Sequence, residues 1–247
     1  MTNRTISFFS KFSLFSNKQF GFLKNRSTQD ALLDFTETIY DALNSRNINI
    51  SILVDLKSAF DTVNHDILLN KLELYGIRGQ GLELYRSYLA DREFYVGLQN
   101  TFSYRKTVNI GIPQGSILGP VLFIIYNNDL PLISKTLNTT LFADDTNFSI
   151  THNDYDLMVP IFNEELNKIS NWTISNRLTI NTSKTELMLF TNKQNVFGDG
   201  RVTLDGGCLD FVDKARFLGV QIDNKMSFRE HINHVVSKVS KHAGYIV

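Results

Sequence analysis

The chain has 247 residues, of which 43% are hydrophobic and 20% charged, so it can bury a sizeable core and lacks the composition of a disordered protein. Its single cysteine, Cys208, predicts no disulfide framework, no disulfide-linked partner and no multi-cysteine zinc site. No apolar run approaches the ~20 residues that cross a bilayer, so no membrane partner is expected. The chain start lacks a signal-peptide pattern, so we expect an intracellular protein. The net charge is zero, but residues 1–30 and 214–247 are basic around an acidic middle. This pattern suits a polyanion that runs past a carboxylate centre, although chance asymmetry of a solvated surface is the simpler interpretation.

The first half of the chain combines helical spacing with short apolar runs. The segment 27–30 has the pattern of a capping box, and the apolar residues that follow recur at three- and four-residue steps, so a helix is predicted there. The β-branched run 49–54 predicts a buried strand that ends at Asp55. The other elements predicted in this half are helices at 67–75, ended by Gly76, and at 82–89, and paired strands at 94–98 and 104–110.

The second half begins with a segment rich in Gly and Pro, residues 111–120, which predicts a structured loop. Asp144 and Asp145 stand between two apolar runs and predict a strand–turn–strand unit. The predicted helices are 121–126, 154–177 with Pro160 near its first turns, and 227–245, and the predicted strands are 137–143, 146–150, 186–190 and 217–222. Strands and helices mix without strict alternation, which predicts an α+β fold.

Three acidic residues stand out because they adjoin apolar strands. Asp55 ends one predicted strand, and Asp144 and Asp145 lie between two others. A charge beside a core is costly unless it is paired or bound to a metal, and adjacent carboxylates raise each other's pKa unless a cation neutralises them. Mg²⁺ suits such a set because it binds a few carboxylates together with phosphate and water oxygens. The alternative is that Asp-Asp is only a favourable turn pair, as most isolated Asp-Asp sequences are.

Three segments around these acids resemble the catalytic motifs of reverse transcriptases. Residues 52–61 are similar to the first motif, 111–120 to the middle motif and 142–145 to the aromatic-x-Asp-Asp hairpin, in the family's order. Segments 75–79 and 128–131 are typical of non-LTR retrotransposons of the Jockey and CR1 type. The resemblance covers about residues 19–232. It implies a right-hand polymerase, with a palm built on an antiparallel sheet packed on helices, partial fingers and a truncated thumb.

The resemblance implies an RNA-directed DNA polymerase that binds an RNA template, a DNA primer and dNTPs and extends the primer 3′-OH. Asp55 and Asp144 match the family's principal metal ligands, Asp145 matches the second aspartate of the hairpin, and Leu56 belongs to the same metal-binding set. The implied cofactor is a pair of Mg²⁺ ions, with Mn²⁺ as a possible substitute. Lys184 matches a catalytic lysine that stabilises charge or donates a proton to the leaving pyrophosphate, although an ordinary surface lysine is an equal alternative.

Other positions match nucleotide and primer contacts of the family. Phe60 matches the aromatic residue under the sugar, where a flat ring leaves no room for a 2′-OH, and its alternative is a core aromatic. The resemblance matches Gln114 and Gly115 to the loop that contacts the nascent base pair and the template. Glutamine suits that role because its amide can donate or accept hydrogen bonds, and glycine because it allows close backbone approach. The alternative is a helix-entry loop. Residues 217–220 resemble the hairpin that holds the primer end in the family, which implies Phe217, Leu218 and Gly219 as primer-binding residues, although a plain core strand is nearly as good an interpretation.

The chain also departs from the family pattern. Residues 1–18 show none of the family's recognisable motifs, and only 19–28 resembles the end of the fingers region, with Leu23 where a basic residue is common. We therefore expect an unmatched segment at 1–18, a fingers remnant and palm at 19–222, and the start of a truncated thumb at 223–247. A truncated copy of a mobile element or an incomplete gene would produce this pattern.

Three hypotheses follow. The first is a working RNA-directed DNA polymerase domain. The second is a catalytically inactive, nucleic-acid-binding remnant, which tight template–primer binding without extension would support. The third is a nucleotidyltransferase with the same acids but an RNA product, which Phe60 disfavours.

Overall fold

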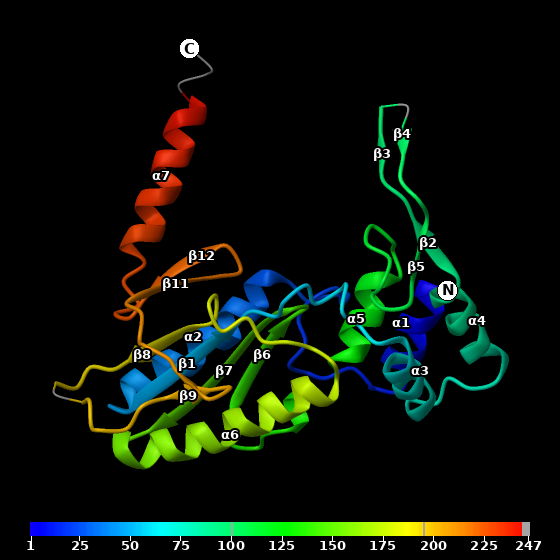
Figure 1. Ribbon diagram of the computed structural model, residues 1–247. Helices are drawn as coiled ribbons and strands as arrows, with labels where there is room; N and C mark the ends of the chain where they lie inside the picture. Colours follow the sequence, from blue (N-terminus) through cyan, green and yellow to red (C-terminus); the bar gives the residue numbers. More distant parts are fainter. Residues whose placement is uncertain (100, 195, 244–247) are drawn as a thin grey trace.

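The computed structural model describes residues 1–99, 101–194 and 196–243, and it shows a sheet-containing lobe beside a helical lobe (Figure 1). The first lobe contains the four-stranded sheet with helices α2 (Thr28–Asn44) and α6 (Tyr155–Ser175). The second contains α1 (Thr2–Lys11), α3 (His65–Leu74), α4 (Gln80–Leu89) and α5 (Gly119–Tyr126). Mixed helices and antiparallel strands confirm the predicted α+β class.

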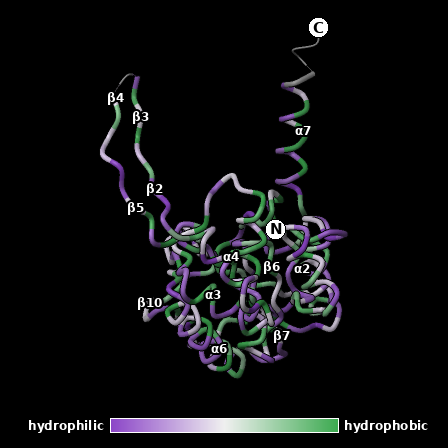
Figure 2. The backbone as a smooth tube through the Cα atoms, turned by 90° about the vertical axis from the view of Figure 1, so that its right-hand side faces the viewer, coloured by the Kyte–Doolittle hydropathy of each residue, from purple (hydrophilic) through white to green (hydrophobic). Residues whose placement is uncertain are grey.

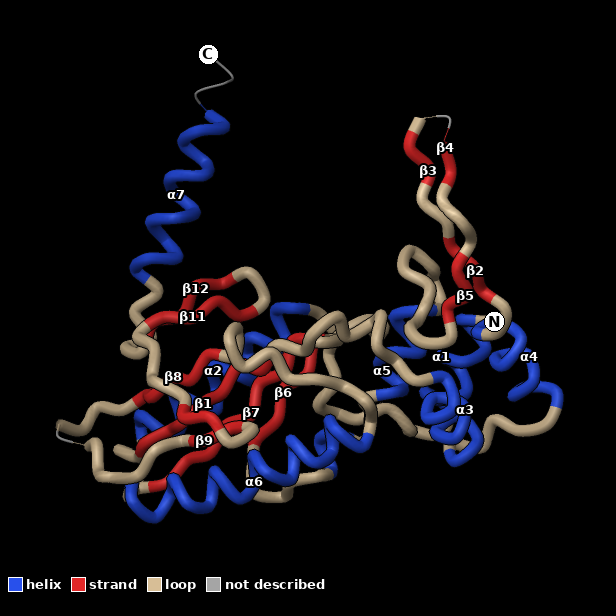
Figure 3. The backbone as a smooth tube through the Cα atoms, in the orientation of Figure 1, coloured by secondary structure: helices blue, strands red, loops and turns tan. Residues whose placement is uncertain are grey.

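The central sheet has the strand order β6-β7-β1-β8, and all its neighbours are antiparallel (Figure 3). Its strands are β1 (Ile48–Val54), β6 (Asn138–Phe142), β7 (Asp145–His152) and β8 (Glu186–Phe190). Every residue of β1 is buried, because β1 lies between two strands and has packing on both faces. Ile52 and Val54 belong to the large core that includes α6, whereas Leu53 belongs to a smaller cluster with Phe35 of α2.

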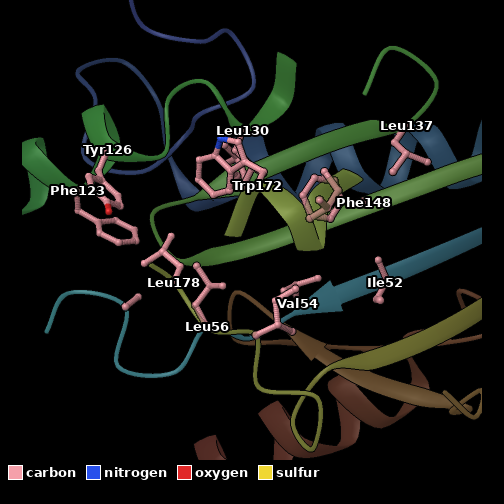
Figure 4. Packing of buried hydrophobic residues seen from close by; sticks show 14 of the residues in the cluster. Ile52, Val54, Leu56, Phe123, Tyr126, Leu130, Leu137, Phe148, Trp172 and Leu178 are labelled. Carbon is pink, nitrogen blue, oxygen red and sulfur yellow. The ribbon is translucent and has the colours of Figure 1, made fainter. Parts of the chain in front are cut away.

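Local sequence signals explain the helix boundaries. Ser27 and Asp30 form the predicted capping box, in which each side chain bonds the other residue's backbone N–H. Asp154 caps α6, whose sixth residue is Pro160. Helix α5 begins two residues earlier than predicted, because Pro120 is suited to the first turn of a helix. Helix α5 is apolar on all sides and correspondingly buried, and its residues Phe123 and Tyr126 lie in the core near Leu56 and Leu178 (Figure 4).

A long hairpin rises from the helical lobe (Figure 1). At its base, β2 (Arg92–Phe94) pairs with β5 (Lys106–Val108). Toward its tip, β3 (Gly97–Leu98) pairs with β4 (Thr101–Phe102). The predicted hairpin is confirmed, and Phe94 pairs with Lys106 within the predicted strands, but Gly97 and Leu98 pair with Thr101 and Phe102, which were predicted to lie in the turn.

The prediction of one strand at 217–222 is wrong. The segment is a hairpin of β11 (Lys214–Phe217) and β12 (Val220–Asp223), because Leu218 and Gly219 have positive φ angles of 47° and 87° and reverse the chain. The structure also contains elements that were not predicted, namely α1, a 3-10 turn at Leu130–Leu132, and the short strands β9 (Thr203–Leu204) and β10 (Gly207–Cys208).

Helix α7 (Arg229–Ala243) ends the described chain and projects from the sheet lobe (Figure 1). It confirms most of the predicted helix 227–245, of which residues 244 and 245 lie outside the described residues. Figure 2 shows hydrophobic and hydrophilic residues alternating along it, and Ile232, Val236 and Val239 are exposed. Across the described part of the chain, no helix combines the length and apolar character needed to cross a bilayer.

Candidate active site

Asp55 lies directly after the last residue of β1 and is half-buried. The chain leaves the sheet at this point for the helical lobe, so Asp55 stands at the end of the sheet nearest that lobe (Figure 1). One oxygen of its carboxylate, Oδ2, accepts a hydrogen bond of 2.8 Å from Nδ2 of Asn181. The backbone oxygen of Asp55 accepts a second bond of 2.8 Å from the Asn181 N–H. Asp55 is thus held through both its side chain and its main chain.

Asp144 and Asp145 lie at the turn between β6 and β7. Phe142 pairs with Asp145, so Ala143 and Asp144 form the two-residue turn. The next residue of β7, Thr146, pairs with Val54, the neighbour of Asp55. The antiparallel register therefore brings the predicted catalytic acids to adjacent strand ends.

The electrostatics of this end favour a cation. Burial raises the pKa of Asp144, and the negative charge of Asp55 raises it further. Burial also raises the pKa of Asp145, with further contributions from Asp144 and Asp55. Carboxylates that disfavour each other's ionisation are the oxygen donors that a divalent ion would neutralise. Among the described residues, however, no three His, Cys, Asp or Glu side chains are grouped closely enough to hold a metal as they stand.

The carboxylates thus fit a hard divalent cation in donor type and charge, but their observed side-chain positions do not form a metal-binding group among the described residues. Leu56 can take part only through its backbone oxygen, because its side chain has no ligand atom and is buried in the core. Its backbone pairs with Ile180 as an isolated β-bridge.

Lys184 lies on the turn that holds Asp55. Its N–H donates to the Asn181 backbone oxygen at 3.0 Å, and its side chain is exposed. In the same turn, Oγ of Ser183 donates to Oδ1 of Asn181 at 2.8 Å, which orients the amide with Nδ2 toward Asp55. The structure therefore connects the Lys184 loop with Asp55 through Asn181, which the sequence analysis had not selected.

The predicted nucleotide-binding residues are Phe60, in the segment after Asp55, and Gln114 and Gly115, in the loop before α5. The Phe60 ring stacks on the core residue Phe123, with centroids 4.5 Å apart, and is half-buried. Gln114 is exposed and its Nε2 donates to Oδ1 of Asp61 at 2.7 Å. Gly115 has a φ of +76° and open space where a Cβ would be, so its backbone conformation explains the glycine.

The predicted primer-binding residues lie at the β11–β12 hairpin. Phe217 is buried against Phe35, with ring centroids 5.2 Å apart. Leu218 and Gly219 form the turn, where Gly219 is exposed and Leu218 is half-buried. A contact with a primer at this hairpin would therefore involve the turn rather than the Phe217 ring.

The model of the family described as reverse transcriptase (RNA-dependent DNA polymerase) matches residues 1–222. The chain belongs to the reverse transcriptase family. The match includes residues 1–18, for which the motifs offered no resemblance. Reverse transcriptases generally use divalent metal ions. The end of the sheet that carries Asp55, Asp144 and Asp145, here called the carboxylate end, has the oxygen donors that such ions prefer.

Curated relatives are polymerases of mobile elements, which confirms the resemblance to Jockey-type retrotransposons. The chain is 29% identical to a probable RNA-directed DNA polymerase from transposon BS of Drosophila melanogaster, over 94% of this chain and 26% of the relative. It is 28% identical to the RNA-directed DNA polymerase from mobile element jockey of Drosophila funebris, over 87% of this chain and 24% of the relative. The chain thus spans about a quarter of the length of these relatives.

Solved telomerase structures share the fold. The Candida albicans telomerase in complex with a fragment of telomeric RNA aligns with a TM-score of 0.61 and 14% identity, over 89% of this chain and 37% of that chain. A truncated apo telomerase from Candida tropicalis aligns with a TM-score of 0.59 and 13% identity, over 90% of this chain and 42% of that chain. The likeness confirms the predicted right-hand polymerase fold.

Two more residues that the sequence analysis did not select contact the turn before Asp144. These are Gln19 and Asn127, both buried. Gln19 is the first residue of the family-like segment 19–28, and Asn127 directly precedes the family-like segment 128–131, so a signal was present. Their role was not visible because a buried amide has no periodic sequence pattern.

Proposed function

We propose that this chain is the polymerase part of a retrotransposon reverse transcriptase and catalyses RNA-directed DNA synthesis. Its substrates would be an RNA template, a DNA primer and dNTPs. The observation that carries the proposal is the convergence of Asp55, Asp144 and Asp145 on adjacent strand ends, where the pKa values of Asp144 and Asp145 are raised. The family and the order of the three motifs support the same reaction.

In this reaction, the primer 3′-oxygen attacks the α-phosphorus of the dNTP and loses its proton to solvent. The bond between that phosphorus and the bridging oxygen breaks, and pyrophosphate leaves. Two Mg²⁺ ions, or Mn²⁺, held by the three aspartates and the Leu56 carbonyl, would supply the positive charge that both oxygens need. The protein's own part is positioning and electrostatic stabilisation.

Further residues would serve the same step. Lys184 would donate a proton to pyrophosphate or stabilise its charge. Phe60, supported from behind by Phe123, would exclude a 2′-OH, and Gln114 and Gly115 would contact the nascent base pair. The primer end would meet Leu218 and Gly219 at the turn of the β11–β12 hairpin, while the buried Phe217 ring would hold the hairpin against Phe35. In this proposal, residues 19–222 form the fingers remnant and palm after the segment 1–18, and residues 223–247 start the thumb.

The test is primer extension by the purified chain on an RNA template with a DNA primer and labelled dNTP. We expect extension in Mg²⁺, abolished in an Asp144→Ala, Asp145→Ala double variant and retained in Asp210→Ala, which changes an exposed carboxylate elsewhere. Unchanged extension by the double variant would refute the carboxylate assignment.

Two other outcomes would select the alternatives. A folded chain that binds template–primer without extending it in Mg²⁺ or Mn²⁺ would be an inactive remnant. Incorporation of NTPs as readily as dNTPs would indicate an RNA product and refute the role of Phe60.

A further inference from the structure

Ala143, the residue before Asp144, is held in an unfavourable backbone conformation. Its φ is +59°, in the left-handed region that residues with a side chain rarely adopt. Such a conformation persists only where the surroundings determine it, and it is most frequent at functional sites. The contacts around Ala143 therefore bear on the conformation of the turn that carries Asp144.

Two buried amide side chains hold the backbone of Ala143. Oε1 of Gln19 accepts a hydrogen bond of 3.1 Å from the Ala143 N–H. On the other side, Nδ2 of Asn127 donates a bond of 2.8 Å to the Ala143 backbone oxygen. Gln19 is 0% and Asn127 is 1% exposed, so water does not compete for these bonds. Both polar groups of Ala143 are satisfied by side chains rather than by a strand partner.

The two amides come from different parts of the fold. Gln19 lies on a segment that runs beside β6, where Phe20 N–H donates to the Leu141 oxygen at 2.8 Å and Leu141 N–H donates to the Lys18 oxygen at 2.9 Å. Asn127 follows the last residue of α5, in the helical lobe. The turn is thus fixed between the edge of the sheet and the helical lobe.

Gly21 completes this contact. Its N–H donates to the same Gln19 Oε1 at 2.7 Å. A Cβ at position 21 would lie 2.6 Å from the Ala143 nitrogen, which is closer than real Cβ contacts allow. The segment can approach the turn only because residue 21 is glycine.

The amides are retained at a cost to stability. No hydrogen-bond partner among the described residues reaches Gln19 Nε2 or Asn127 Oδ1, although both atoms are buried. An unpaired buried amide atom is destabilising, and an apolar side chain of similar shape would avoid that penalty. The half of each amide that is paired is the half that contacts Ala143.

We propose that Gln19 and Asn127 are positioning residues that hold the Ala143 peptide and thereby aim the carboxylates of Asp144 and Asp145. The inference rests on the proposed polymerase function for its catalytic consequence, while the hydrogen bonds can be tested without it. Residues that orient metal ligands typically affect metal affinity or activity by about 10- to 100-fold.

The first test concerns the structure alone. Backbone hydrogen exchange is measured by NMR in the wild-type chain and in Gln19→Met, which keeps the length of the side chain and removes its amide. We expect the Ala143 and Gly21 amides to exchange about 10-fold faster or more, since both donate to Gln19 Oε1. The matched control is Asn128→Leu, which changes a buried amide adjacent to Asn127 that bonds Leu14, Ser16 and Tyr75 but not the turn.

The second test concerns catalysis. Single-turnover dNTP addition at saturating dNTP is expected to fall about 10- to 100-fold in Gln19→Met and Asn127→Leu, with template–primer affinity unchanged. Asn128→Leu is expected to lower thermal stability while leaving the rate per folded molecule near wild type. If Gln19→Met does not fold, Gly21→Ala replaces it, because the added methyl displaces the turn and leaves the Gln19 amide in place.

The two failures are distinguishable. Unchanged exchange at Ala143 and Gly21 in folded Gln19→Met would overturn the inference even if the wild type is an active polymerase. A wild type without polymerase activity would refute the proposed function, and the exchange data would still decide whether the amides hold the turn. An equal loss of rate in Asn128→Leu would indicate a general structural effect and would also overturn the inference.

Discussion

The carboxylate end of the sheet and the two projections differ in how their residues are stabilised. Ala143 and Asp55 are hydrogen-bonded by side chains from distant segments, and the strands behind them are buried. The hairpin from β2 to β5 and α7 project from the rest of the molecule (Figure 1), and they carry exposed apolar side chains, such as Phe102 and Val236. The residues at the carboxylate end are therefore fixed by contacts within the described chain, whereas the hairpin and α7 contribute little packing to the core.

The largest expected effect tests this difference in stability. Phe148 of β7 is 1% exposed, whereas Phe102 of the hairpin is 64% exposed. We expect Phe148→Ala to lower the free energy of unfolding by about 3–5 kcal/mol, because it leaves a cavity under α6, and Phe102→Ala to change it by about 0.5 kcal/mol or less. Urea unfolding followed by circular dichroism measures both. Equal losses would show that the hairpin is part of the cooperative core.

The next effect concerns the junction between the lobes. Tyr126 of α5 donates a hydrogen bond of 2.5 Å to the Asn176 oxygen after α6, and burial raises the pKa of Tyr126 to about 12. A raised folded-state pKa means that the stabilisation is complete below the unfolded pKa near 10 and is lost as the pH rises toward 12. The loss attributable to this hydroxyl is about 2–3 kcal/mol.

The variant Tyr126→Phe isolates this contribution. We expect it to be less stable than wild type at pH 8, because the Asn176 oxygen loses its partner, and to lose less stability between pH 10 and pH 12. Urea unfolding at several pH values measures the difference between the two chains. Parallel pH profiles would show that other tyrosines cause the alkaline loss.

The smallest of these effects concerns the hydrogen bond on Asp55. Asn181→Ala removes the amide that donates to Oδ2, so we expect primer extension to slow by about 10-fold and to require more Mg²⁺. Thr182→Ala, at the exposed neighbouring position, is the control and is expected to behave as wild type. A Mg²⁺ titration of the initial rate measures both. Equal Mg²⁺ dependence in Asn181→Ala and wild type would remove Asn181 from the positioning of Asp55.

Much of the fold was predictable from local pattern. The capping box at Ser27 and the β-branched run before Asp55 specify a helix and a buried strand by short-range rules. The β11–β12 hairpin was predicted as one strand because its reversal uses Leu218, a residue that rarely adopts positive φ. A local sequence pattern does not predict a turn at a residue such as Leu218, because leucine adopts positive φ only where contacts with the rest of the fold impose it.

The candidate site divides in the same way. Asp55, Asp144 and Asp145 were identified because their motifs are compact and each acid adjoins a strand. Gln19 was not identified, since its partner Ala143 lies 124 residues away and a single buried amide leaves no repeating signal. Asn181 was missed for a related reason, because its partner Asp55 lies 126 residues away.

By itself, the sequence determined the family, the α+β class, most helices and strands, and the three acids, because these depend on residue order and short-range periodicity. The tertiary structure alone decided which segments meet at the strand ends, which amides hold Ala143 and Asp55, and which pKa values rise. Those properties depend on burial and on contacts between segments far apart in the chain, and both arise only when the sheet and the helical lobe pack together.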